Sequence, residues 1–241
     1  MLHTARATAR RMRGLLSALL VVGALPLSAQ ATDTRPTLAV LYFTNSALVD
    51  FDSYAPLSKG MAEMLINEIA QNQAVRVVER DRLQPLLEEQ NLQNSDRVDK
   101  ETAVKLGKTL GARHMLMGSF VIDPNKNLRI DVRAVNTETS AIEYVKTVSG
   151  KADQLLQLVI DLGQQINTGL NLPALKTAST TVPAAKNPNQ FKALMAMSQA
   201  LEAEDKDDIK GAATLYRAAV ALAPEYQPLQ TKLAMITSKE R

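Results

Sequence analysis

The stretch Val75–Phe120, VRVVERDRLQPLLEEQNLQNSDRVDKETAVKLGKTLGARHMLMGSF, decides the fold. The β-branched run Val75–Val78 is typical of a short strand, and the apolar segment Ala112–Ile122 predicts a second one. Two helical patterns lie between these strands. Because strands and helices follow one another with so little intervening chain, we expect an α/β fold with a mixed sheet flanked by helices.

The first helical pattern directly follows the first strand. Leu83, Leu86 and Leu87 recur at spacings of three and four residues, which places them on one face of a helix. Asp81 is the expected N-cap of this helix. Pro85 would then lie in the first turn, where its missing N–H costs nothing.

The second helical pattern has a clear start and a clear end. The polar segment 91–97 predicts a turn, after which Asp99 is expected to begin the helix and Gly111 to end it. The other parts of the sheet and its helices follow from the same kinds of pattern. We expect strands at 37–43, 128–135 and 142–149, a helix at 57–71, and a long helix that Asp153 caps.

The chain changes character after the α/β part. Residues 173–188 are rich in threonine, alanine, proline and lysine, which is typical of a linker. Residues 189–241 then resemble a tetratricopeptide-like all-α unit, because small residues at Ala212 and Ala219 flank Tyr216 and Pro224 follows at the expected spacing. A plain helical hairpin remains the alternative, and a third helix is expected at 227–238.

The amino terminus has the pattern of a secretory signal. Four arginines, with no acidic residue, precede an apolar run that ends in Ala29-Gln30-Ala31, an A-x-A cleavage site. Without those four arginines, 24 basic residues face 25 acidic ones, so the formal net charge of +3 gives no reason to expect nucleic-acid binding. The chain has no cysteine, hence no lipobox cysteine and no disulfide.

These observations predict four segments along the chain. They are a signal peptide at 1–31, the α/β domain at 32–172, the linker at 173–188 and the helical unit at 189–241. We expect an exported periplasmic protein without a membrane span in the mature chain, with a peripheral position at the outer membrane as a further option.

Four segments of the α/β part form a combined pattern. They are LAVLYFTN at 38–45, LSKGMAEMLINEIAQ at 57–71, RVVERDRLQPLLEEQ at 76–90 and DKETAVKLGKTLGARHMLMGSF at 99–120. Together they resemble the CsgG family, the curli-secretion type of envelope protein, and more loosely the TolB amino-terminal domain fold. The resemblance covers about residues 37–171.

The resemblance implies a non-enzymatic protein that acts through protein–protein contacts in the secretion or assembly of surface structures. Its partners would be envelope proteins or peptides, or further copies of itself. Two other functions stay open: an LpoB-like periplasmic regulator of a peptidoglycan synthase, and a small-molecule-binding periplasmic domain. The best-known family members form pores from amphipathic hairpins. Here the strands that flank residues 128–135 are already needed for the sheet, so we expect no pore.

Few residues of the mature chain have the chemistry of a catalyst. His114 is its only histidine and lies in an apolar strand, where a structural role is the usual one. One histidine and no cysteine exclude the common zinc sites. Gly107-Lys108-Thr109 lacks the upstream glycine of a phosphate-binding loop. We therefore expect neither a cofactor nor an enzyme.

The candidate partner-binding residues form two groups. Glu79, Arg80, Asp81 and Arg82 make a mixed-charge cluster at a strand end. A local ion-pair and capping cluster is the first interpretation, and an intersubunit contact is the second. In the helical unit, Phe191 and Tyr216 are the candidates, because its groove is the expected peptide-binding surface.

Overall fold

The computed structural model describes residues 33–92, 98–173 and 187–240. The described residues from Thr34 onward form one compact unit. The predicted signal peptide at 1–31, residues 174–186 of the predicted linker at 173–188 and residues 93–97 of the predicted turn at 91–97 lie outside the described residues. The predicted domain boundaries stay predictions.

The described residues form a mixed sheet, as predicted. β1 pairs in parallel with β3 and β4, whereas β4, β5 and β6 are antiparallel neighbours, which gives the order β3-β1-β4-β5-β6. β2 continues the direction of β1 and also pairs with β4. The strands are β1 (Thr37–Val40), β2 (Thr44–Asn45), β3 (Arg76–Val77), β4 (His114–Ile122), β5 (Asn127–Asn136) and β6 (Ile142–Lys151).

Burial along the strands follows their place in the sheet. All four residues of β1 are buried, because the strand has a parallel neighbour on each side and helices near both faces. β5 alternates as predicted: Leu128 and Ile130 are buried, while Arg129 and Arg133 are exposed. The predicted period of two is therefore confirmed for this strand.

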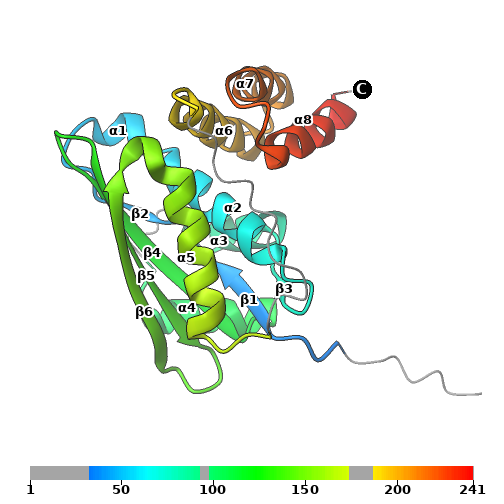
Figure 1. Ribbon diagram of the computed structural model, residues 1–241. Coiled ribbons are helices and arrows are strands. Elements are labelled where there is room, and N and C mark those ends of the chain that lie inside the picture. The colour runs from blue at the N-terminus through cyan, green and yellow to red at the C-terminus, as the bar shows by residue number, and fades with distance from the viewer. Residues whose placement is uncertain (1–32, 93–97, 174–186, 241) are drawn as a thin grey trace, which may run out of the picture. The chain divides into compact units, whose positions relative to one another are not determined.

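The helices lie on both faces of the sheet and beyond it (Figure 1). On one face, α5 packs against β6, where Leu158 lies beside Gly150, and α2 packs beside α5. On the opposite face, α4 places Gly107 against Met115. The helices are α1 (Phe51–Tyr54), α2 (Leu57–Ala70), α3 (Arg80–Glu89), α4 (Lys100–Leu110), α5 (Leu155–Gly169), α6 (Gln190–Asp205), α7 (Ile209–Leu222) and α8 (Gln227–Lys239), with a 3₁₀ turn, η2, at Ala152–Gln154.

The ends of α4 are those that the sequence predicts. The Asp99 carboxylate accepts a hydrogen bond from the Thr102 backbone N–H at 2.8 Å. Gly111 ends the helix with φ 65°, a left-handed conformation that a residue without a Cβ adopts at little cost.

Two predicted caps are wrong. Glu79 is the N-cap of α3, so Asp81 lies exposed in the first turn and Pro85 lies inside the helix. The helix therefore begins earlier than predicted, at Arg80, whose side chain takes part in a long-range ion pair that local sequence patterns do not reveal. Asp153 belongs to η2 instead of capping α5, since the Gln154 side chain accepts a hydrogen bond from the Lys151 N–H and starts a 3₁₀ turn there.

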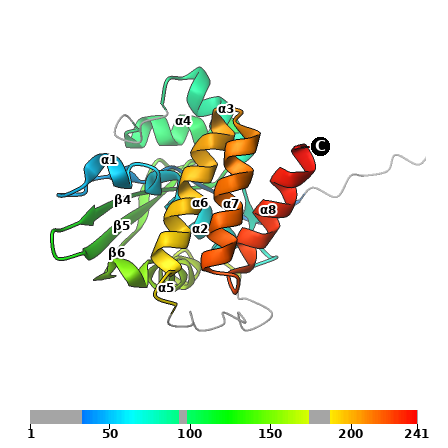
Figure 2. The same ribbon diagram turned by 90° about the horizontal axis from the view of Figure 1, so that it is seen from above.

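The predicted C-terminal helices are present, and they pack on α2. In Figure 2, α6 and α7 lie side by side, with α8 beside α7. Gly60 of α2 meets Ser198 of α6 so closely that a Cβ on Gly60 would lie 1.8 Å from Ser198 Oγ. Pro224 follows the end of α7, as predicted. The tetratricopeptide-like character of this unit stays a prediction.

Replacing Gly60 with leucine should disrupt the contact between α2 and α6. Overpacking a well-packed helix contact costs about 1–3 kcal/mol, and we expect the free energy of unfolding to fall by at least about 1 kcal/mol in urea denaturation. Ala218→Leu is the control, because Ala218 is exposed on α7. Equal unfolding free energies for the two variants would contradict the close contact.

Candidate functional site

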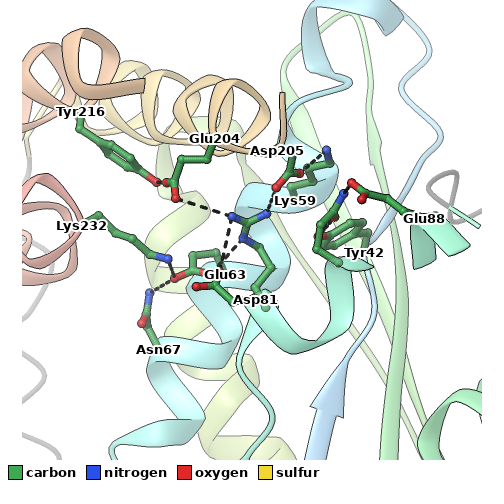
Figure 3. A network of polar contacts seen from close by, with 12 residues as sticks. Tyr42, Lys59, Glu63, Asn67, Asp81, Glu88, Glu204, Asp205, Tyr216 and Lys232 are labelled. Atoms are coloured by element: carbon green, nitrogen blue, oxygen red, sulfur yellow. Dashed lines mark hydrogen bonds and ion pairs between the residues drawn. The ribbon is translucent and has the colours of Figure 1, made fainter. Parts of the chain in front are cut away.

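A buried ionic network connects α2 and α3 to the C-terminal helices (Figure 3). Its centre is Arg80, whose side chain is 4% exposed. The Arg80 guanidinium donates a hydrogen bond to Asp205 and lies 3.9 Å from Glu204, at the end of α6. Its Nε is 4.0 Å from Glu63 of α2. One arginine therefore faces three carboxylates from two helices.

Two lysines and a tyrosine complete the network. Lys59 Nζ lies 2.6 Å from Asp205, and Lys232 Nζ of α8 lies 2.9 Å from Glu63. The Tyr216 hydroxyl of α7 donates a hydrogen bond to Glu204. Burial, together with the neighbouring Glu204, raises the pKa of Tyr216 above its ordinary range, so this hydroxyl keeps its proton. Each of α6, α7 and α8 thus contributes a polar partner.

The charges of the network compensate one another. In the buried part of the network, Arg80, Lys59 and Lys232 face an equal number of carboxylates, Glu63, Glu204 and Asp205, while the fourth carboxylate near Arg80, that of Asp81, is exposed. Such compensation is needed because a buried charge without a partner costs several kcal/mol. The helix ends contribute as well. The positive end of the α3 dipole meets the negative end of the α6 dipole at the Arg80–Asp205 pair.

The predicted cluster at residues 79–82 is divided between the interior and the surface. Arg80 is buried, whereas Glu79, Asp81 and Arg82 are exposed. The local ion pair expected within the cluster exists between Arg80 and Asp81, at 3.9 Å. The carboxylate closest to Arg80 is that of Asp205, which accepts a hydrogen bond from it and lies 125 positions away in the sequence.

The two predicted residues of the helical unit lie in different surroundings. Tyr216 is fully buried beneath α6 and belongs to the network. Phe191 is half-buried and makes an edge-to-face contact with Tyr54, at 6.3 Å between ring centroids. Their role in partner binding stays a prediction.

Sequence reasoning missed the partners of Arg80. Two signals were present in the sequence. Glu63 stands among the apolar residues of the α2 stripe, beside Met64. Glu204 and Asp205 end a helix, where the dipole disfavours anions unless a cation lies nearby. Both signals indicate that a buried cation lies nearby, but neither shows which residue supplies it.

His114 is held by a carboxylate. Its Nδ1 forms a hydrogen bond with Glu143, which also accepts one from Asn136 Nδ2 at 3.1 Å. The cluster joins the ends of β4, β5 and β6, so this histidine fixes strand ends, in keeping with the structural role expected of it.

A groove of about 620 Å³ lies beside the network, between α2, α5 and α8. Its apolar residues include Met64 of α2, Val159 and Ile160 of α5, and Met235 of α8. Arg80, Glu63 and Lys232 line it as well. The groove is therefore formed jointly by the α/β part and the C-terminal helices.

The groove carries an excess of acidic side chains. Lys232 pairs with Glu63, and Arg80 pairs with Asp205 outside the groove lining. Among the described residues, no ion pair exists for the other glutamates of the lining, Glu68, Glu79 and Glu225. Burial, aided by Asp161, raises the pKa of Glu68, although the hydrogen bond from Gln71 opposes the shift.

The model of one protein family matches this chain. Its description is "Curli production assembly/transport component CsgG", and the match covers residues 25–122. The resemblance to the CsgG family is confirmed. The described part of the matched region runs from the start of β1 to the end of β4 and includes α2 and Arg80. A search of curated protein sequences found no significant match.

Several solved structures are similar to a part of this chain. The LpoB C-terminal domain from Escherichia coli is 17% identical with a TM-score of 0.40, and the match covers 52% of this chain and 89% of that domain. Lipoprotein GNA1162 from Neisseria meningitidis is 13% identical, with TM-score 0.40 and coverages of 55% and 99%. PelC from Paraburkholderia phytofirmans, solved as a dodecamer, is 12% identical, with TM-score 0.35 and coverages of 58% and 90%.

Two further properties of the described residues bear on function. None of their helices is both long enough and apolar enough to cross a membrane. No three histidine, cysteine, aspartate or glutamate side chains within the described ranges are grouped so that they could hold a metal ion.

Replacing Arg80 with methionine should strongly destabilise the fold. The variant leaves Glu204 and Asp205 without their central cation, and breaking a buried ion pair by removing one partner costs about 3–5 kcal/mol. Arg82→Met is a matched control, since Arg82 is exposed and only two positions away; it should change the free energy of unfolding by less than about 0.5 kcal/mol. Urea denaturation measures both, and similar losses would refute a central role for Arg80.

Glu68→Gln should stabilise the protein at neutral pH. Because the folded-state pKa of Glu68 is raised, protonation favours the folded state below the ordinary carboxyl pKa of about 4.3, and this contribution is lost as the pH rises through the folded-state value. Glutamine removes the cost of the charged form. The gain at pH 7 should stay below about 1 kcal/mol, since Glu68 is only half-buried, and should vanish in acid. Unfolding curves at several pH values, with Glu89→Gln as the control, would show this.

Proposed function

We propose that this chain is an exported, non-enzymatic envelope protein that binds other proteins during the secretion or assembly of surface structures. The main support for this proposal is the groove of about 620 Å³ that the region similar to CsgG forms together with α5 and α8. Its volume falls within the range typical of binding sites, about 300–1,000 Å³. The family's description as an assembly and transport component gives the class of process.

The chemistry beside the groove supports binding in preference to catalysis. The charged groups of the network are paired with one another: Arg80 with Asp205, and Lys232 with Glu63. A general acid or base needs a proton that it can exchange near neutral pH. Groups held in compensated ion pairs suit positioning instead, because they fix the helices that form the groove.

Export is supported by the sequence of the amino terminus. A basic segment, an apolar run and the Ala29-Gln30-Ala31 site follow one another in the order of a secretory signal. The chain has no cysteine, so its exported form would rely on its core and ionic network instead of disulfides.

Export predicts a defined mature protein. When the tagged chain is expressed in a bacterium with two membranes, the intact mass of the periplasmic protein should correspond to a start near Thr32. A chain recovered uncleaved from the cytoplasm would contradict the export part of the proposal.

Partner binding is tested in the same cells. Cross-linking of intact cells, followed by affinity purification, should recover an envelope protein in a defined ratio to the tagged chain. A thermal-shift screen with nucleotides and metabolites should give no large specific shift. A metabolite that strongly stabilises the protein, together with the absence of any cross-linked protein, would refute the proposal.

A further inference from the structure

We infer that the groove between α2, α5 and α8 binds a basic amphipathic segment of a partner protein. The apolar side chains of this segment would lie on the groove floor, and its lysine or arginine side chains would lie along the acidic rim. The inference rests on the proposed function and adds the chemistry of the partner.

The groove floor is apolar and comes from two helices of the α/β part. Leu156, Val159 and Ile160 of α5 lie beside Met64 of α2. Met235 of α8 is also in the lining and is 56% exposed. Methionine adapts its shape to different apolar partners, so an exposed methionine here suits a peptide side chain. Since Met64, Leu156, Val159 and Ile160 are at most 7% exposed, Met235 is the one of these five residues whose covering removes much apolar surface from water, which favours binding.

The rim supplies carboxylates that need cations. Glu68, Glu79, Asp81 and Glu225 line the groove, and within the described residues the one ion pair that any of them forms is that of Asp81 with Arg80, at 3.9 Å, where Arg80 is already paired with Asp205. Acidic side chains at this density favour a positively charged occupant and disfavour phosphate groups. A nucleic acid or an anionic lipid surface therefore fits poorly.

The chain itself shows how a lysine fits this groove. Lys232 extends from α8 and places its ammonium 2.9 Å from Glu63, although both side chains are largely buried, at 19% and 5% exposed. Glu68 lies five residues further along α2, on the side that packs against Gly163 of α5, and is half-buried, with Gln71 as its hydrogen-bond donor. A lysine of the partner would form an ion pair with Glu68, as Lys232 does with Glu63.

Three labelled peptides of about 14 residues, long enough to form a helix on binding, test the inference by fluorescence anisotropy with the purified protein. The first alternates leucine and lysine at amphipathic helical spacing. The second has glutamate in place of lysine, and the third keeps the lysines but has glycine and serine in place of leucine. We expect the first to bind at least about tenfold more tightly than the others, and its affinity to fall with added salt.

Variants locate the binding site. The double variant Glu68→Gln/Asp81→Asn and the single variant Met235→Ala should each weaken binding of the leucine–lysine peptide about fivefold. Matched controls at exposed positions, Glu89→Gln/Glu138→Gln and Leu48→Ala, should leave the affinity unchanged. Unfolding curves for every variant separate lost binding from lost structure.

The outcomes separate the inference from the proposed function. Equal binding of the lysine and glutamate peptides, no binding of either, or affinities that the groove variants do not change would overturn the inference. The cell cross-linking is repeated with the groove variants. A partner captured equally by wild type and variants would overturn the groove assignment and leave the proposed function standing. No capture by the wild type, together with a metabolite that strongly stabilises the protein, would remove both.

Discussion

The buried guanidinium of Arg80 is the constraint on which the arrangement of helices depends. A charge at this depth is tolerated only with partners, and the chain supplies them from α2 and from the end of α6. The contact also brings the positive end of one helix dipole to the negative end of another. The C-terminal helices therefore satisfy a charge of the α/β part as well as covering apolar surface.

The same constraint shapes the groove. Lys232 ties α8 to Glu63 of α2, and α2 in turn packs on α5 through the contact of Glu68 with Gly163. These contacts fix both walls and the floor. The groove is a product of the two parts of the chain together, and the segment that resembles CsgG supplies only some of its lining.

The sequence was sufficient for elements defined by local pattern. The alternation of β5, the cap at Asp99 and the glycine end of α4 were predicted because neighbouring residues determine them. The ion pair of Arg80 was missed for the opposite reason: its partner Asp205 is 125 positions away. Local periodicity carries no information on such a pairing. The acids at the end of α6 indicated a missing cation without identifying it.

The charges of Glu63 in α2 and Arg80 in α3 also link the region that resembles CsgG to the helices that follow it. Glu63 and Arg80 lie within the region that resembles CsgG, yet Arg80 finds its closest carboxylate, and Glu63 its closest ammonium, on helices beyond it. Without those helices, both side chains would be exposed to water, where a charge needs no buried partner. In this chain, the helices that follow the region therefore turn two ordinary surface charges into a buried network.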